Sequence, residues 1–189
     1  MKKRVILMSL SLLLTTALKA QEPSKPEHKK RVYKADGNTY VQKSLPIYLN
    51  FSTEPNGEQH KLTSKATAKY ADPMYLDTEG INYIRSHWAV NTETGQTVEP
   101  KIEVLYELYA DGLAPITMLS LTGGPRYSRS GTVFYGKGLM ANLSAEDGVS
   151  GVEGTYYALG GAFKKYSSSL TLNSEGAKTI YYYSYDNVG

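Results

Sequence analysis

Apolar residues in this chain fall mostly in short runs that Gly, Pro, Asn and Asp interrupt. Two of these runs alternate strictly with other residues. From 47 to 52 the odd-numbered positions are Ile, Leu and Phe, and from 139 to 145 they are Leu, Ala, Leu and Ala. Successive side chains of a β-strand point to opposite faces, so this alternation predicts two strands that each bury one face. The chain as a whole is predicted to be all-β.

The segment Lys101–Tyr109 fits two patterns. Its apolar residues alternate as in a strand, but they also occur at i, i+3, i+4 and i+7, the spacing of an amphipathic helix. The segment lies between Pro100 and the turn residue Asp111, which leaves little length for a helix. We therefore predict a strand here.

The chain contains an internal repeat. Residues 64–80 align with 160–176 without a gap, and 49–54 align with 141–146. The first alignment places Lys69, Tyr70, Met74, Leu76, Glu79 and Gly80 over Lys165, Tyr166, Leu170, Leu172, Glu175 and Gly176. Such self-similarity predicts one structural module that is present twice.

The second copy also resembles a known family. The residues that carry the resemblance are Glu146–Val152, the pair Tyr156-Tyr157, Phe163–Tyr166, Ser174–Gly176 and Ile180–Gly189. Residues 133–189 are similar to the bacterial immunoglobulin-like repeat called the "outer-membrane-protein L type β-barrel" domain, and 33–113 resemble it more distantly. The resemblance implies small immunoglobulin-like sandwiches in tandem on a secreted or outer-membrane protein. We expect sandwiches despite the family's name, because strands of about ten residues with a lipid-facing apolar band are missing.

We therefore expect an all-β chain with two tandem immunoglobulin-like β-sandwich modules. Its parts are a signal peptide (1–20), a polar linker (21–32), module 1 (33–113), a linker with the first strand of module 2 (114–132), and the rest of module 2 (133–189). Module 1 continues past Thr92–Gly95 into a final strand, whereas module 2 ends at the equivalent turn, Val188-Gly189. The second module should thus lack its last strand, and an unpaired strand edge favours pairing with another chain.

The N-terminus has the pattern of a secretory signal peptide. A basic head, Met1–Arg4, precedes an apolar run that extends to about Ala17, and we predict cleavage after Ala20. The apolar run is shorter than the roughly 20 residues of a membrane-spanning helix, so we expect no transmembrane segment in the mature chain. The predicted location is the periplasm, the outer membrane or the exterior.

Removal of this leader changes the charge of the chain. Four of the 21 basic residues lie within it and none of the 18 acidic residues does, which leaves 17 basic and 18 acidic side chains. A nucleic-acid partner is not expected, because such binding depends on clustered Lys and Arg. The chain has no Cys and three scattered His, a composition that gives no zinc-binding pattern and no candidate cofactor.

Two groups of residues are candidates for binding. Asp147 and Asp186 are weak candidates for Ca²⁺, although Asp before Gly is also an ordinary turn pair. Tyr181, Tyr183 and Tyr185 would share one face of a strand, where they could form an exposed aromatic strip that contacts a glycan or a protein of the envelope. The alternative for the tyrosines is packing across neighbouring strands.

No spacing in the sequence indicates a catalytic site, since we find no nucleophile motif, P-loop or paired acids at a defined separation. We expect a non-catalytic exported envelope protein with binding, adhesive or spacer modules and an unknown ligand. The alternative is an accessory region of a larger secreted or outer-membrane enzyme whose catalytic domain lies beyond residue 189.

Overall fold

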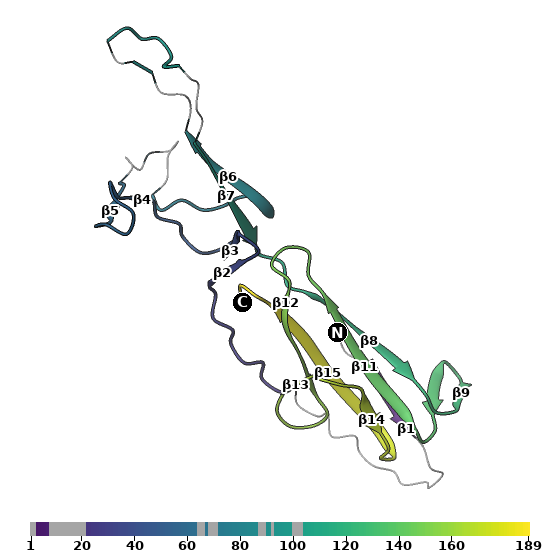
Figure 1. Cartoon of the computed structure of the whole chain (residues 1–189). Helices are drawn as coiled ribbons and strands as arrows, with labels where there is room; N and C mark the ends of the chain where they lie inside the picture. Colours follow the sequence, from purple (N-terminus) through teal and green to yellow (C-terminus); the bar gives the residue numbers. More distant parts are fainter. Residues whose placement is uncertain are drawn as a thin grey trace. The chain divides into compact units, whose positions relative to one another are not determined.

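The computed structural model describes residues 3–7, 22–63, 67, 72–86, 90–91, 93–99 and 104–189. Within these residues every regular element is a β-strand and there is no helix, so the all-β prediction is confirmed. The described residues form two compact units (Figure 1). Unit 1 comprises those in Met1–His28 and Ala114–Asn187, and unit 2 comprises those in Lys29–Leu113 and Val188–Gly189.

Unit 1 contains two sheets. The larger has the order β13-β12-β15-β1-β10-β9, and the smaller has the order β14-β11-β8. The strands of the larger sheet are β1 (Lys3–Leu7), β9 (Arg126–Arg129), β10 (Thr132–Tyr135), β12 (Val152–Ala158), β13 (Lys164–Lys165) and β15 (Gly176–Asp186). Those of the smaller are β8 (Ile116–Thr122), β11 (Leu139–Glu146) and β14 (Leu170–Leu172).

The core of unit 1 is formed by side chains from both sheets, as in a β-sandwich. Leu139, Ala141 and Leu143 of β11 are buried, whereas Met140 between them is 39% exposed. They cluster with Ile180 and Tyr182 of β15. The predicted strand with one buried face over 139–145 is thereby confirmed.

Unit 2 has a sheet of the order β2-β3-β7-β6 and a separate two-stranded sheet of β4 and β5. The strands are β2 (Val32–Ala35), β3 (Asn38–Gln42), β4 (Asn50–Phe51), β5 (His60–Lys61), β6 (Gly80–Ser86) and β7 (Val104–Asp111). The strand that we predicted between Pro100 and Asp111 is therefore present as β7, and residues 101–103 lie outside the described part of the chain.

The core of unit 2 consists, among the described residues, of Val41, Leu76 and Ala110. The prediction of a buried face over 47–52 is wrong at Leu49 and Phe51, which are 39% and 49% exposed, whereas Ile47 packs against the core. Leu49 and Phe51 adjoin or belong to β4, whose one partner strand among the described residues is the short β5, and the described core of unit 2 does not include them. Alternation predicted the strand but not what would cover it.

A tight turn of the same kind joins the first hairpin strands of each unit. Asp36-Gly37 connects β2 to β3, and Ser130-Gly131 connects β9 to β10. All four residues have positive φ, from 48° to 79°. Two consecutive left-handed residues match the right-handed twist of a hairpin, which explains the preference for Asp-Gly and similar pairs.

Several sequence expectations fall on residues that are not described, including Lys69 and Tyr70 of the repeat. Where both copies are described, Leu76 and Leu172 are buried, and Gly80 and Gly176 each begin a strand with φ near 90°. The described part of the chain has no helix that is long and apolar enough to cross a bilayer.

The expectation that the second module has an open strand edge needs a correction. Strand β1, from the predicted signal peptide, lies beside β15 and pairs with its Gly176–Ile180 half. The edge is thus occupied by residues from the opposite end of the sequence, a long-range pairing that the local pattern could not predict.

Candidate functional site

The three candidate tyrosines lie in the second half of β15, and β12 runs antiparallel beside them. Tyr156 of β12 is directly opposite Tyr183, and Gly154 is opposite Tyr185. Directly opposed residues project from the same face of a sheet. Tyr156, Tyr183 and Tyr185 therefore form one surface, which we call the outer aromatic face.

The opposite side of β15 faces the sandwich core. Ile180 and Tyr182 belong to the buried cluster, and Ser184 exchanges a hydrogen bond of 2.8 Å with Thr155 of β12. Thr117 of β8 also donates to the Ser184 hydroxyl, at 2.9 Å, and so links the two sheets of unit 1. The division of β15 into two faces, predicted from its alternation, is present.

The outer aromatic face is not an exposed strip. Tyr181 is 7% exposed and Tyr183 is 9% exposed. His28 lies on this face, with its ring stacked on Tyr185 at 3.5 Å between centroids and 16° between planes. The expectation of an exposed Tyr181, Tyr183 and Tyr185 strip is therefore wrong about exposure, because the segment before β2 covers the rings.

Further groups complete this cover. The His28 Nε2 atom forms a hydrogen bond of 3.2 Å with the Tyr183 hydroxyl. The Lys25 ammonium lies 5.3 Å from the Tyr183 ring centroid, within the range of a cation–π contact. Phe163 meets the same ring edge-on, with centroids 4.9 Å apart.

Gly154 makes room for this arrangement. A Cβ at this position would lie 3.1 Å from Cε2 of Tyr156 and 3.5 Å from Cε1 of Tyr185. The pairing of β12 with β15 also shifts register between Val152 and Gly154, which marks a β-bulge. The missing side chain and the bulge together allow two rings to occupy the surface above Gly154.

Burial changes the acid–base properties of two groups in the cluster. Loss of solvent lowers the pKa of His28 from its ordinary value of 6.5, while the negative charge of Asp186 acts in the opposite direction and raises it. Burial raises the pKa of the Tyr183 hydroxyl, and the nearby Tyr156 adds to that rise. Both shifts favour the neutral forms that pack against each other.

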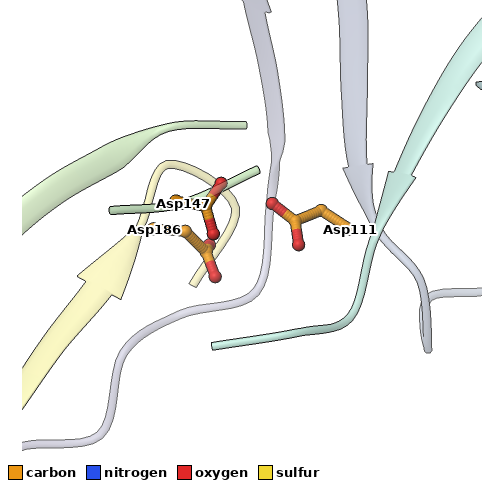
Figure 2. Close-up of side chains that lie close together, drawn as sticks. All are labelled: Asp111, Asp147 and Asp186. Atoms are coloured by element: carbon orange, nitrogen blue, oxygen red, sulfur yellow. The ribbon is translucent and has the colours of Figure 1, made fainter. Parts of the chain in front are cut away.

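The two weak calcium candidates, Asp147 and Asp186, are brought together at one end of unit 1 (Figure 2). One carboxylate oxygen of Asp147 lies within 4.8 Å of one carboxylate oxygen of Asp186. One oxygen of Asp147 accepts hydrogen bonds from the backbone N–H groups of Val149 and Gly151, at 3.0 and 2.8 Å. This is the pattern by which Asp organises a turn. Two carboxylates also offer fewer oxygens than the six to eight that Ca²⁺ takes.

The third carboxylate labelled in Figure 2, Asp111, is the last residue of β7 and belongs to unit 2. It is 1% exposed, and its Oδ1 accepts a hydrogen bond of 3.4 Å from the backbone N–H of Leu113. The backbone carbonyl of Asp111 accepts a hydrogen bond of 2.9 Å from the backbone N–H of Lys43. Asp111 thus stabilises the chain where β7 ends.

Sequence reasoning missed His28, Lys25 and Gly154. Nothing near His28 in the sequence indicates a tyrosine partner, since 155 positions separate it from Tyr183. Tyr156 was recognisable in principle, because two adjacent aromatic strands predict cross-strand ring pairs. No protein-family model matches this chain, and no curated protein or solved structure matches it significantly.

Proposed function

We propose that this chain is an exported, non-catalytic β-sandwich protein of the cell envelope, and that its modules are tandem immunoglobulin-like repeats serving as a structural spacer. The proposal rests on the leader pattern of residues 1–20, the internal repeat and the family resemblance. The all-β structure with a sandwich core is consistent with it.

The observation that carries the spacer role is the engagement of the candidate binding residues by the fold itself. Tyr183 packs against His28 and Phe163, and Asp147 holds a turn through two backbone N–H groups. A side chain that is committed to packing or to a turn stabilises its module. This arrangement favours a structural role over ligand binding through the outer aromatic face.

The export part of the proposal is tested by expressing the full chain in a bacterium and measuring the mass of the protein recovered from the envelope fraction. We expect a mature form that begins at Gln21. The variant Ala20→Leu should keep the leader, because a bulky residue replaces the small one before the cleavage site. Recovery of the unmodified chain from the cytoplasm with Met1 still attached would contradict export.

The spacer part is tested by a binding screen of the mature chain against envelope glycans and proteins. We expect Tyr181→Ala and Tyr183→Ala to lower the free energy of unfolding without changing the set of molecules that bind. A glycan that binds the mature chain and is lost in both variants, with folding intact, would instead favour an adhesive function.

A further inference from the structure

The segment that covers the outer aromatic face, residues 22–28, is not part of the sandwich itself. We call this segment the strap. In the described part of the chain the strap forms no strand, and the core cluster of unit 1 contains none of its residues. Four consecutive strap residues, 24–27, are exposed. The strap is therefore a surface segment, and its departure from the face would leave the core of the sandwich intact.

Two side chains of the strap make its contacts with the face. The ammonium group of Lys25 lies 5.3 Å from the centroid of the Tyr183 ring. The imidazole of His28 contacts all three rings of the face, with centroids 3.5 Å from Tyr185, 5.8 Å from Tyr183 and 6.1 Å from Tyr156. A hydrogen bond to the Tyr183 hydroxyl fixes the imidazole further. The face thus contacts one cation and one ring.

The spacing of these two side chains follows from the prolines of the strap. Pro23 and Pro26 restrict φ, and the residue before each proline is restricted to extended conformations. Such a sequence favours the polyproline II helix, in which residues three apart point to the same side. Lys25 and His28 are three apart, and both of them contact the ring of Tyr183. The sequence of the strap therefore suits this surface.

The face is built by the sandwich and not by the strap. Tyr156 and Tyr183 are paired across β12 and β15, and Gly154 is opposite Tyr185. Phe163 meets the Tyr183 ring edge-on, at 4.9 Å between centroids. Aromatic surfaces of this kind recur in proteins that bind cations and extended proline-containing segments.

We propose that the outer aromatic face is a peptide-binding surface and that the strap is its resident ligand, an autoinhibitory contact that keeps the face closed. The peptides that the face accepts are extended, contain proline, and carry a cationic side chain three residues before an imidazole. A closed face agrees with a spacer role. The inference does not depend on export, because residues 22–28 are present with or without the leader.

Tethering explains why the strap excludes a free peptide of the same sequence. A ligand joined to its site by a short segment has an effective concentration in the millimolar range, so it outcompetes a dilute free copy. Loss of the two anchoring side chains from the strap should remove this advantage. The double variant Lys25→Ser with His28→Ser, which we call the opened variant, should therefore bind the free peptide.

The experiment titrates the full chain and the opened variant with a synthetic peptide of residues 21–30, and follows amide chemical shifts by NMR. We expect saturable shifts at 154–157 and 181–185 in the opened variant, and apparent binding at least about tenfold weaker in the unmodified chain. The control peptide carries Lys25→Glu and Glu27→Lys, which keeps the composition and the net charge but breaks the spacing. It should bind the opened variant at least about tenfold more weakly than the native sequence.

Unchanged shifts and slow hydrogen exchange in β11 verify that the sandwich is folded. If the double variant does not fold, His28→Ser alone gives the same comparison. Three results would overturn the inference: no saturable shift in a folded opened variant with about 10 mM peptide, equal binding of the native and control peptides, or equal binding of the native peptide to the opened variant and the unmodified chain. None of these results bears on whether the leader is cleaved.

Discussion

The two units fill the same interior position of their sheets with strands from different parts of the chain: β7 lies between β3 and β6, and β1 lies between β10 and β15. In unit 2, β7 pairs along all seven residues of β6, and in unit 1 the five-residue β1 pairs only with Gly176–Ile180 of the longer β15. Each unit contains a hairpin whose turn has two left-handed residues, β2–β3 in unit 2 and β9–β10 in unit 1. The same strand arrangement is therefore completed in unit 2 by a strand that follows β6 in the sequence, and in unit 1 by a strand from the N-terminus.

The units also differ in how their sheets are covered. In unit 1, two sheets enclose a core of Leu139, Ile180 and Tyr182, and an outer layer of aromatic rings covers β15. In unit 2, the core among the described residues is smaller and consists of Val41, Leu76 and Ala110. Unit 1 should therefore depend more strongly on its core.

The largest expected effect is that of a cavity in the core of unit 1. Ile180→Ala should lower the free energy of unfolding of this unit by about 2–5 kcal/mol, because the side chain is fully buried between the two sheets. Denaturant unfolding of the variant measures the loss. Leu76→Ala is the matched change in unit 2 and should cost less. An equal loss for both would contradict the difference between the cores.

An added side chain at Gly154 should have the next largest effect. Gly154→Val should destabilise unit 1 by about 1–3 kcal/mol, since its Cβ would meet the Tyr156 ring at 3.1 Å. The control is Gly148→Ala, at a position where a Cβ meets nothing within 4 Å. Thermal unfolding of both variants tests the packing of the outer aromatic face. A Gly154→Val protein as stable as the unmodified chain would refute the close contact of this position with the Tyr156 ring.

A smaller effect is expected when the cover of that face is weakened. His28→Ala removes the stack on Tyr185 and the hydrogen bond to Tyr183, and should cost about 0.5–1.5 kcal/mol. Lys30→Ala is the control, because its exposed contact with Ser44 lies in unit 2. Faster hydrogen exchange at 181–185 in the His28 variant alone would support the arrangement, and identical exchange in both variants would argue against it.

The smallest effect is a dependence on pH. The pKa of His28 is lowered by burial, so the unfolded chain binds a proton more readily than the folded one. The stabilisation is fully present above pH 6.5, the unfolded value, and is lost as pH falls through the lower folded value. Melting temperatures from pH 8 to 5 should fall more for the unmodified chain than for His28→Ala. Parallel curves would refute the role of His28.

The sequence predicted those parts of the fold that depend on local patterns. Alternation identified the buried face of β11, and the Asp147-Gly148 pair was recognisable as a turn. The same alternation failed at Leu49 and Phe51, because burial depends on which elements cover a strand. It also could not place His28 or β1, since each contacts residues more than a hundred positions away.

The most direct test of the pairing between β1 and β15 is hydrogen exchange at Gly176–Ile180, compared between the mature chain and the leader-retaining variant Ala20→Leu. In the variant β1 pairs with these five residues, and no other strand does so among the described residues. We predict fast exchange at these amides in the mature chain and slow exchange in the variant, with β11 equally protected in both. Equally slow exchange at 176–180 in a mature chain that begins at Gln21 would contradict the account.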